Sequence, residues 1–69
     1  MLLKLKGKIV ERYRTQSRFA VCCGKPENWI SRIITNRDKP TEQDINIFRV
    51  KLKIPDSEID SYLVNDENG

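Results

Sequence analysis

The sequence predicts an all-α fold, a single compact domain of five short helices over residues 1–69. Apolar residues recur at the three- and four-residue spacing of helices, and the β-branched residues do not alternate as they would in strands. Proline, glycine and helix-capping residues divide the chain into pieces of helix length. A chain of 69 residues buries only about 60% of its unfolded surface, so no separate catalytic domain is expected.

The first helix is predicted from Leu3 to Tyr13, because Leu5, Ile9 and Tyr13 repeat every four residues and make one apolar stripe. Gly7 weakens this helix by about 1 kcal/mol relative to alanine. We expect Gly7 to let a neighbouring helix approach closely.

The second helix is predicted over residues 16–23, with Thr15 as its N-cap and Gly24 as the glycine that ends it. Gly24 is also expected to supply the positive φ of a turn. Ala20 is small, which suits a second helix packed closely against the first.

The third helix is predicted over residues 26–34. Pro26 fits its first turn, where the missing N–H costs nothing, and Lys25 then takes the N-cap position, for which lysine is poorly suited. Its inner face is expected to consist of three isoleucines, the last of them only partly covered: Ile30, Ile33 and Ile34.

A polar loop at residues 35–40 separates the third helix from a fourth, which Thr41 is predicted to cap. Thr41 and Asp44 have the spacing of a capping box, with aspartate in place of the usual glutamate. The buried stripe of the fourth helix is expected to consist of Ile45, Phe48 and Leu52.

Pro55 ends the fourth helix, and Asp56 is predicted to cap a short fifth helix. Residues 64–69 are predicted to form a frayed acidic tail. The end of the chain carries more apolar residues than one short helix needs: Ile54, Ile59, Tyr62, Leu63 and Val64. Two interpretations stay open, because these residues form either a two-fold interface of a homodimer or the edge of the chain's own core.

Composition excludes several kinds of site. The cysteines Cys22 and Cys23 without any histidine cannot build a four-ligand zinc site, so we expect no metal and no cofactor. Cys23 is expected in the core and Cys22 as an exposed thiol, in a reduced, cytoplasmic chain. No stretch approaches the roughly 20 apolar residues of a membrane span, so no membrane partner is expected. Without histidine, paired carboxylates in a pocket or a glycine-rich phosphate loop, neither an enzyme nor a small-molecule substrate is expected.

Charge is unevenly distributed along the chain. Residues 1–53 hold all 13 lysines and arginines against five acids, whereas residues 54–69 hold five acids and no base. A basic body with an acidic end suits a polyanionic partner for the body. The alternative is a solvated surface with a chance asymmetry, and charge alone does not decide between the two.

The most informative stretch is 16–35, a predicted helix-turn-helix. Its two short helices are joined by residues 24–26, a turn of the length expected for this motif. Four residues supply the core that the two helices share: Phe19, Cys23, Ile30 and Ile33.

Residues 15–20, then Gly24, then residues 29–33, then Arg37 and Pro40 resemble the XRE or Cro/cI family of helix-turn-helix regulators. The resemblance covers about residues 3–63. It implies a five-helix lambda repressor-like fold and a phage- or prophage-type transcriptional regulator, acting in the bacterial cytoplasm or nucleoid or in a phage-infected host. Arg14 departs from the glycine that such chains often carry, which predicts a strained turn, and Pro26 replaces the usual Ser or Thr cap.

In this family the second helix of the motif, here residues 26–34, enters the major groove of a double-stranded DNA operator. The residues predicted to contact bases are Glu27, Asn28, Ser31 and Arg32, and those predicted to contact phosphates are Gln16, Ser17, Lys25, Asn36, Arg37 and Lys39. Asparagine can bridge adenine N6 and N7, arginine can bridge guanine O6 and N7, and glutamate can accept from cytosine N4.

Each of these residues also has a structural interpretation. Glu27 suits the dipole at a helix start, and Arg37 and Lys39 suit a solvated loop. Trp29 is expected to pack against the loop or the fourth helix rather than to contact DNA. The alternative function is a protein-interaction module of the same fold, antirepressor- or antitoxin-like, which would bind a partner regulator around Trp29 or the acidic end.

Overall fold

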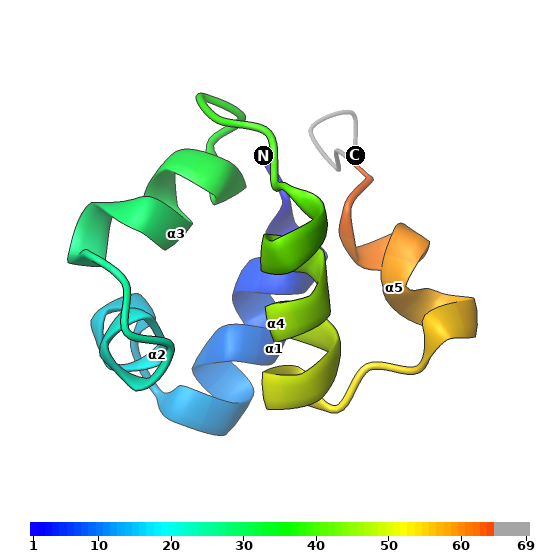
Figure 1. The fold of residues 1–69 in the computed structure, drawn as a ribbon, viewed down its shortest axis with the longest axis horizontal. Helices are drawn as coiled ribbons and strands as arrows, with labels where there is room; N and C mark the ends of the chain where they lie inside the picture. The colour runs from blue at the N-terminus through cyan, green and yellow to red at the C-terminus, as the bar shows by residue number, and fades with distance from the viewer. Residues whose placement is uncertain (65–69) are drawn as a thin grey trace.

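The computed structural model describes residues 1–64, and every regular element within that range is a helix. The five helices are α1 (Leu3–Tyr13), α2 (Gln16–Cys22), α3 (Glu27–Ile34), α4 (Glu42–Leu52) and α5 (Asp56–Tyr62). In Figure 1, α2 and α3 lie on one side of the molecule, α5 lies on the other, and α1 and α4 run between them. The predicted all-α, five-helix fold is therefore confirmed.

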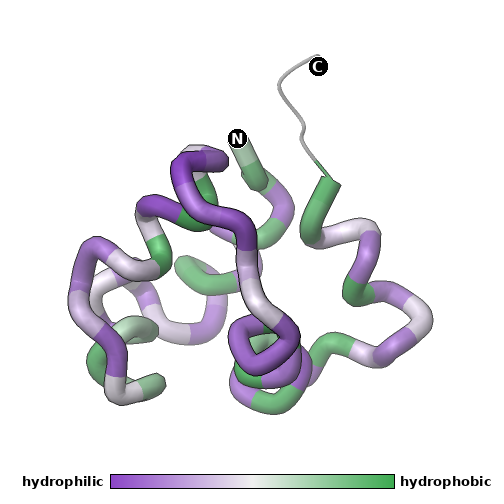
Figure 2. Tube along the Cα trace, turned by 45° about the horizontal axis from the view of Figure 1, so that its top comes forward, coloured by the Kyte–Doolittle hydropathy of each residue, from purple (hydrophilic) through white to green (hydrophobic). Residues whose placement is uncertain are grey.

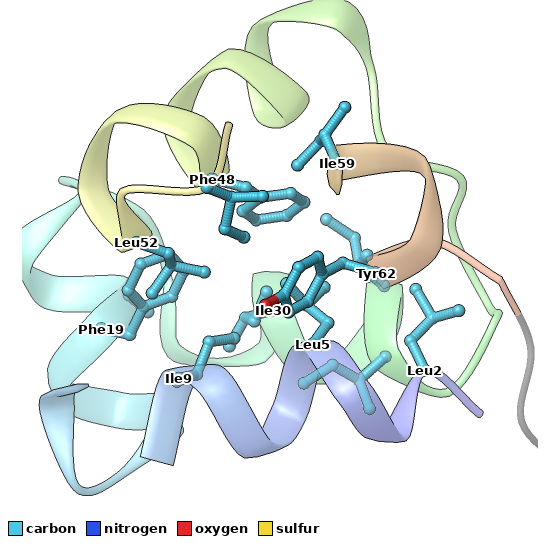
Figure 3. Packing of buried hydrophobic residues seen from close by; sticks show 13 residues of the cluster. Leu2, Leu5, Ile9, Phe19, Ile30, Phe48, Leu52, Ile59 and Tyr62 are labelled. Atoms are coloured by element: carbon cyan, nitrogen blue, oxygen red, sulfur yellow. The ribbon is translucent and has the colours of Figure 1, made fainter. Parts of the chain in front are cut away.

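All five helices contribute to one core, in which their apolar side chains converge (Figure 3). Phe19 and Phe48 are fully buried, with ring centroids 6.2 Å apart, and they join α2 to α4. The other buried hydrophobic residues are Leu2, Leu5, Ile9, Ala20, Ile30, Ile33, Ile34, Leu52, Ile54, Ile59 and Tyr62. A chain this short depends on such a shared core, because no single pair of helices buries enough apolar surface.

Both threonine caps lie where the sequence predicts them. The Thr15 hydroxyl oxygen accepts from the Arg18 N–H at 3.1 Å, at the start of α2. At the start of α4, the Thr41 hydroxyl oxygen accepts from the Asp44 N–H at 3.1 Å, and the Asp44 carboxylate accepts from the Thr41 N–H at 2.9 Å. The predicted capping box is therefore complete.

The predicted starts of α3 and α5 are wrong by one residue, for one reason. Pro26 and Pro55 are N-caps with extended ψ values of 152°, so Lys25 is not the cap of α3 and Asp56 is the first residue of α5 rather than its cap. Each proline carbonyl accepts the first backbone bond of its helix, from Trp29 N–H at 3.0 Å and from Glu58 N–H at 2.9 Å. A proline can do this because the N-cap position needs a carbonyl acceptor and no N–H.

Three smaller expectations also need correction. Helix α2 ends at Cys22, and Cys23 is its C-cap. Ile34 is fully buried rather than partly covered. A Cβ added at Gly7 would meet no atom within 4 Å, so Gly7 does not accommodate a neighbouring helix as we expected. Gly7 faces solvent because Leu5 and Ile9 carry the buried stripe of α1.

Most of the apolar residues near the end of the chain cover its own core. Ile54, Ile59 and Tyr62 are buried and Leu63 packs against the core, whereas Val64 is exposed. The interpretation as the edge of the core therefore accounts for all of them but Val64. Apart from Val64, the predicted acidic tail lies outside the described residues.

None of the helices within residues 1–64 combines the length and the apolar character that crossing a bilayer requires. Over the same stretch, no three Cys, Asp or Glu side chains are grouped so that they could hold a metal ion.

Candidate nucleic-acid interface

Helices α2 and α3 form a helix-turn-helix. They are joined by residues 23–26, and Gly24 has the predicted positive φ of 71°. The Lys25 N–H donates to the Ala20 carbonyl at 2.9 Å, which draws the turn back onto α2. Ala20 is completely buried, as close packing requires. Figure 1 shows α2 almost along its axis and α3 from the side.

Helix α3 has an apolar underside and a polar outer face. Ile30 and Ile33 are buried in the core, whereas Glu27, Asn28 and Arg32 are exposed and Ser31 is partly exposed. These four polar residues, all predicted as base contacts, define the outer face of α3. Asn28 and Arg32 are four residues apart and therefore lie on the same side of the helix.

The middle of the outer face is held by bonds within the helix. The Ser31 hydroxyl donates to the Asn28 carbonyl at 3.3 Å, and the Thr35 hydroxyl donates to the Ser31 carbonyl at 2.7 Å. Ser31 can still accept a hydrogen bond through its oxygen. The Asn28 side-chain amide has no partner within residues 1–64, so both of its ends are available to a ligand.

Ser17 and Glu27, which were predicted to contact phosphate and base separately, contact each other. The Ser17 hydroxyl donates to the Glu27 carboxylate and thereby ties the start of α2 to the start of α3. Glu27 also lies in the first turn of α3, where a negative charge complements the helix dipole. Gln16, the neighbouring predicted phosphate contact, is half-buried.

Arg32 forms a bidentate ion pair that was not predicted from the sequence. Its Nε donates to Asp38 Oδ2 at 2.8 Å, and its Nη2 donates to Asp38 Oδ1 at 3.2 Å. The bond to Arg32 lowers the pKa of the Asp38 carboxyl, and the same bond raises the pKa of the Arg32 guanidinium. A signal was available in the sequence, because Asp38 is the one acid among residues 28–41.

The loop after α3 folds back against the end of the helix. The N–H groups of Arg37 and Asp38 both donate to the Arg32 carbonyl, at 2.8 and 3.1 Å. Asn36 turns the chain with a positive φ of 65°, a conformation that asparagine tolerates better than most residues. Three of the predicted phosphate contacts, Asn36, Arg37 and Lys39, are therefore exposed on a loop beside Arg32.

Figure 2 shows this loop as a run of hydrophilic residues between α3 and α4. Lys25, the remaining cation predicted to contact phosphate, lies at the opposite end of α3 from the loop. It is half-buried, with its Nζ 5.7 Å from the centre of the Trp29 ring. The outer face of α3 and the loop of residues 35–40, called the basic loop below, therefore lie together on one surface.

Known proteins add nothing to this geometry. No family model, curated protein or solved structure matches the chain. The similarity to XRE-type regulators stays a prediction carried by the residues themselves.

Trp29 packs, partly buried, against the core and α4, as predicted. Its ring forms a triangle with those of Phe19 and Phe48, with centroid distances of 6.0 and 5.9 Å. Its indole N–H donates to the Asp44 carboxylate at 3.2 Å, so the capping residue of α4 also holds α3. Trp29 therefore sets how α3 sits on the domain, which is a role in positioning rather than in contact with a ligand.

Cys22 lies as predicted, whereas Cys23 lies at the edge of the core rather than within it. Cys22 is exposed, and Cys23 is half-buried against the core. Burial raises the pKa of the Cys23 thiol, so the thiolate form that redox chemistry needs is disfavoured.

Proposed function

We propose that this chain is a sequence-specific, double-stranded-DNA-binding transcriptional regulator of the phage repressor or Cro type, which places α3 in the major groove. One observation supports this most directly. Helix α3 buries Ile30 and Ile33 while it presents Asn28 and Arg32 outward, next to a basic loop. An α-helix with a polar outer face fits the major groove, where base edges can be distinguished by hydrogen bonds.

The two exposed polar side chains have complementary roles in this proposal. Asn28 suits adenine, because its amide can accept from N6 and donate to N7, and Arg32 suits guanine. Each good bidentate pair discriminates against a wrong base by about 1–3 kcal/mol. Arg37 and Lys39 contact phosphates on one side and Lys25 on the other, which supplies affinity without sequence information.

No contact in the structure favours the alternative of a protein-interaction module. That alternative relied on a partner surface around Trp29 or the acidic end of the chain. The indole packs against two phenylalanine rings and is hydrogen-bonded to Asp44. The exposed acids of α5 remain as a surface of this kind, although one of them, Asp56, is paired with Arg49.

Selection of bound sites from random duplex DNA, with the full chain, tests the proposal. We expect enrichment of one sequence and a steep fall of affinity with salt. If the chain acts as a homodimer, the enriched site is a pseudo-palindrome whose half-sites lie about 34 Å apart. Equal retention of all duplexes, or retention of none, would show that the proposal is wrong.

Two substitutions test the assignment of the outer face. We expect Asn28→Ala and Arg32→Ala each to weaken binding to the selected duplex by about thirtyfold, the middle of the range for a bidentate base contact. Gln43→Ala and Arg12→Ala are the controls, since both residues are exposed on other helices, the changes in charge are the same, and glutamine exceeds asparagine by a single methylene. Unchanged binding by both test variants would refute base reading by α3.

A further inference from the structure

The ion pair between Arg32 and Asp38 uses only one edge of the guanidinium group. Asp38 accepts from Nε and from Nη2, which together form the side edge. An arginine has five N–H donors, of which this pair takes two. The N–H groups of Nη1 and Nη2 at the far end remain, and no residue within 1–64 binds them.

These remaining donors form a second fork. One N–H of Nη1 and one of Nη2 point in parallel away from the side chain, which is the geometry that matches guanine O6 and N7. The side-on ion pair does not compete with this fork. It restricts the rotation of the guanidinium plane, and therefore reduces the conformational entropy lost when a base is bound.

The backbone, rather than chance contact, holds Asp38 in this place. The Arg32 carbonyl accepts from the N–H of Asp38 itself at 3.1 Å, so the partner residues are joined twice, by main chain and by side chain. The turn at Asn36 brings Asp38 back to the helix. The carboxylate is thus positioned before any ligand arrives.

Charge favours a base over a phosphate as the ligand of this pair. Arg32 and Asp38 together carry no net charge, so their attraction to a phosphate is largely cancelled, and the carboxylate repels it. The edge of guanine carries no net charge and offers two acceptors, so the neighbouring carboxylate repels it much less than it repels a phosphate.

We infer that Asp38 is a positioning residue for base recognition: it holds Arg32 side-on, so that the end of the guanidinium is presented to the O6 and N7 of a guanine in the major groove. This inference depends on the proposed function, and it goes further by naming the base and the residue that orients its reader. Asp38 itself need not touch the DNA.

The test measures preference for guanine rather than affinity. The duplex returned by the selection is compared with duplexes in which each G·C pair in turn is replaced by A·T. In the wild-type chain, one of these replacements is expected to weaken binding by about 5- to 150-fold, a factor called the guanine penalty below. The guanine that Arg32 contacts is identified as the one whose penalty is lost in Arg32→Ala. In Asp38→Ala and Asp38→Asn we expect the penalty at that guanine to fall by about threefold or more, because the fork is no longer oriented.

Glu42→Gln is the matched control, because it removes the same charge from an exposed residue close to the loop. It is expected to change the affinity for all duplexes equally and to leave the guanine penalty intact. The Arg32 Nε–H signal in NMR spectra gives a second measurement without DNA. Its slow exchange with water is expected in the wild type and in Glu42→Gln, and its loss is expected in Asp38→Asn, whose backbone spectrum also reports whether the variant is folded.

Each other outcome overturns the inference in a recognisable way. If Asp38→Ala binds more tightly and keeps the full guanine penalty, Asp38 competes with DNA for Arg32 and does not position it. If the chain selects a sequence but Arg32→Ala changes no guanine penalty, the inference is wrong and the proposed function stands. If the chain selects no sequence, the proposed function fails and the inference fails with it.

Discussion

Gly7 and Gly24 both have open space around them, but they differ in backbone conformation, which is helical at Gly7 and left-handed at Gly24. A Cβ added to either would meet no atom within 4 Å. Gly7 lies inside α1, whereas Gly24 has a φ of 71° in the turn between α2 and α3. Comparison of the two glycines therefore separates backbone conformation from steric contact.

We predict that Gly7→Ala stabilises the domain by about 1 kcal/mol, because alanine loses less conformational freedom than glycine in a helix. Gly24→Ala is expected to destabilise it by about 1–2 kcal/mol, because an L-residue is strained at this φ. Urea unfolding followed by circular dichroism measures both, and each variant is the control for the other. Destabilisation by Gly7→Ala would show that the added methyl group meets a neighbouring atom.

Arg14 is the third residue whose backbone decides its role. It has a φ of 73° between α1 and α2, at the position where the sequence predicts a strained turn. Its N–H donates to the Val10 carbonyl at 2.9 Å, so it ends α1 as a glycine would. An arginine at this φ costs more than a glycine would, because an L-residue is strained there.

Among the helices, the junction of α3 with α4 depends on Asp44. Its carboxylate accepts from the Thr41 N–H at 2.9 Å and from the Trp29 indole at 3.2 Å, and it is the one buried charged residue among those described. A single carboxylate therefore caps one helix and fixes the orientation of the other. This connection matters for function, because the outer face of α3 is only useful when α3 is held in one orientation.

We predict that Asp44→Ala destabilises the domain by about 2–3 kcal/mol, since it removes the acceptor of two donors and leaves the partly buried indole N–H unpaired. Thr41→Ala loses one side of the capping box, and Trp29→Phe loses one hydrogen bond while it keeps most of the ring packing. Each of these is expected to cost about 1 kcal/mol. Chemical unfolding of the three variants measures the differences. If Asp44→Ala were no worse than Thr41→Ala, the bond to Trp29 would not contribute.

Across the whole molecule, charge is unevenly distributed, although two lysines of α1, Lys4 and Lys8, lie over the Tyr62 ring of α5. The basic loop beside α3 carries Arg37 and Lys39, whereas α5, on the other side in Figure 1, carries the exposed acids Asp56, Glu58 and Asp60. In the proposed function, an anionic polymer is attracted to the basic loop and repelled by the acids of α5, which helps to orient the domain on DNA before any base is read.

We predict that Lys39→Ala lowers the slope of log affinity against log salt by about 0.9, the value for one phosphate contact. Lys6→Ala is the control, because Lys6 is an exposed lysine of α1 rather than of the loop, and the change in net charge is equal. Binding to the selected duplex is measured over a series of salt concentrations. Equal slopes for Lys39→Ala and Lys6→Ala would show that the loop does not contact a phosphate, whatever happens to α3.

The sequence alone determined the helices and the direction of their faces. Thr15, Thr41 and Gly24 act on residues three or four positions away, and the apolar stripe of each helix repeats at the same short distance. Interactions of this range need no knowledge of the fold. The helix starts at Pro26 and Pro55 were missed by one residue because an N-cap proline and a first-turn proline have nearly the same φ and differ in ψ.

Only the tertiary structure decided which polar side chains are bound to each other. Ser17 reaches Glu27 ten residues on, Arg32 reaches Asp38 six residues on, and Trp29 reaches Asp44 fifteen residues on. Each of these pairs forms across a turn or loop whose path is set by packing against the core. The periodicity of the sequence predicts on which face of a helix a side chain lies. Its hydrogen-bonding partner outside that helix depends on the path of the chain after the helix, which is set by the packing of the whole fold.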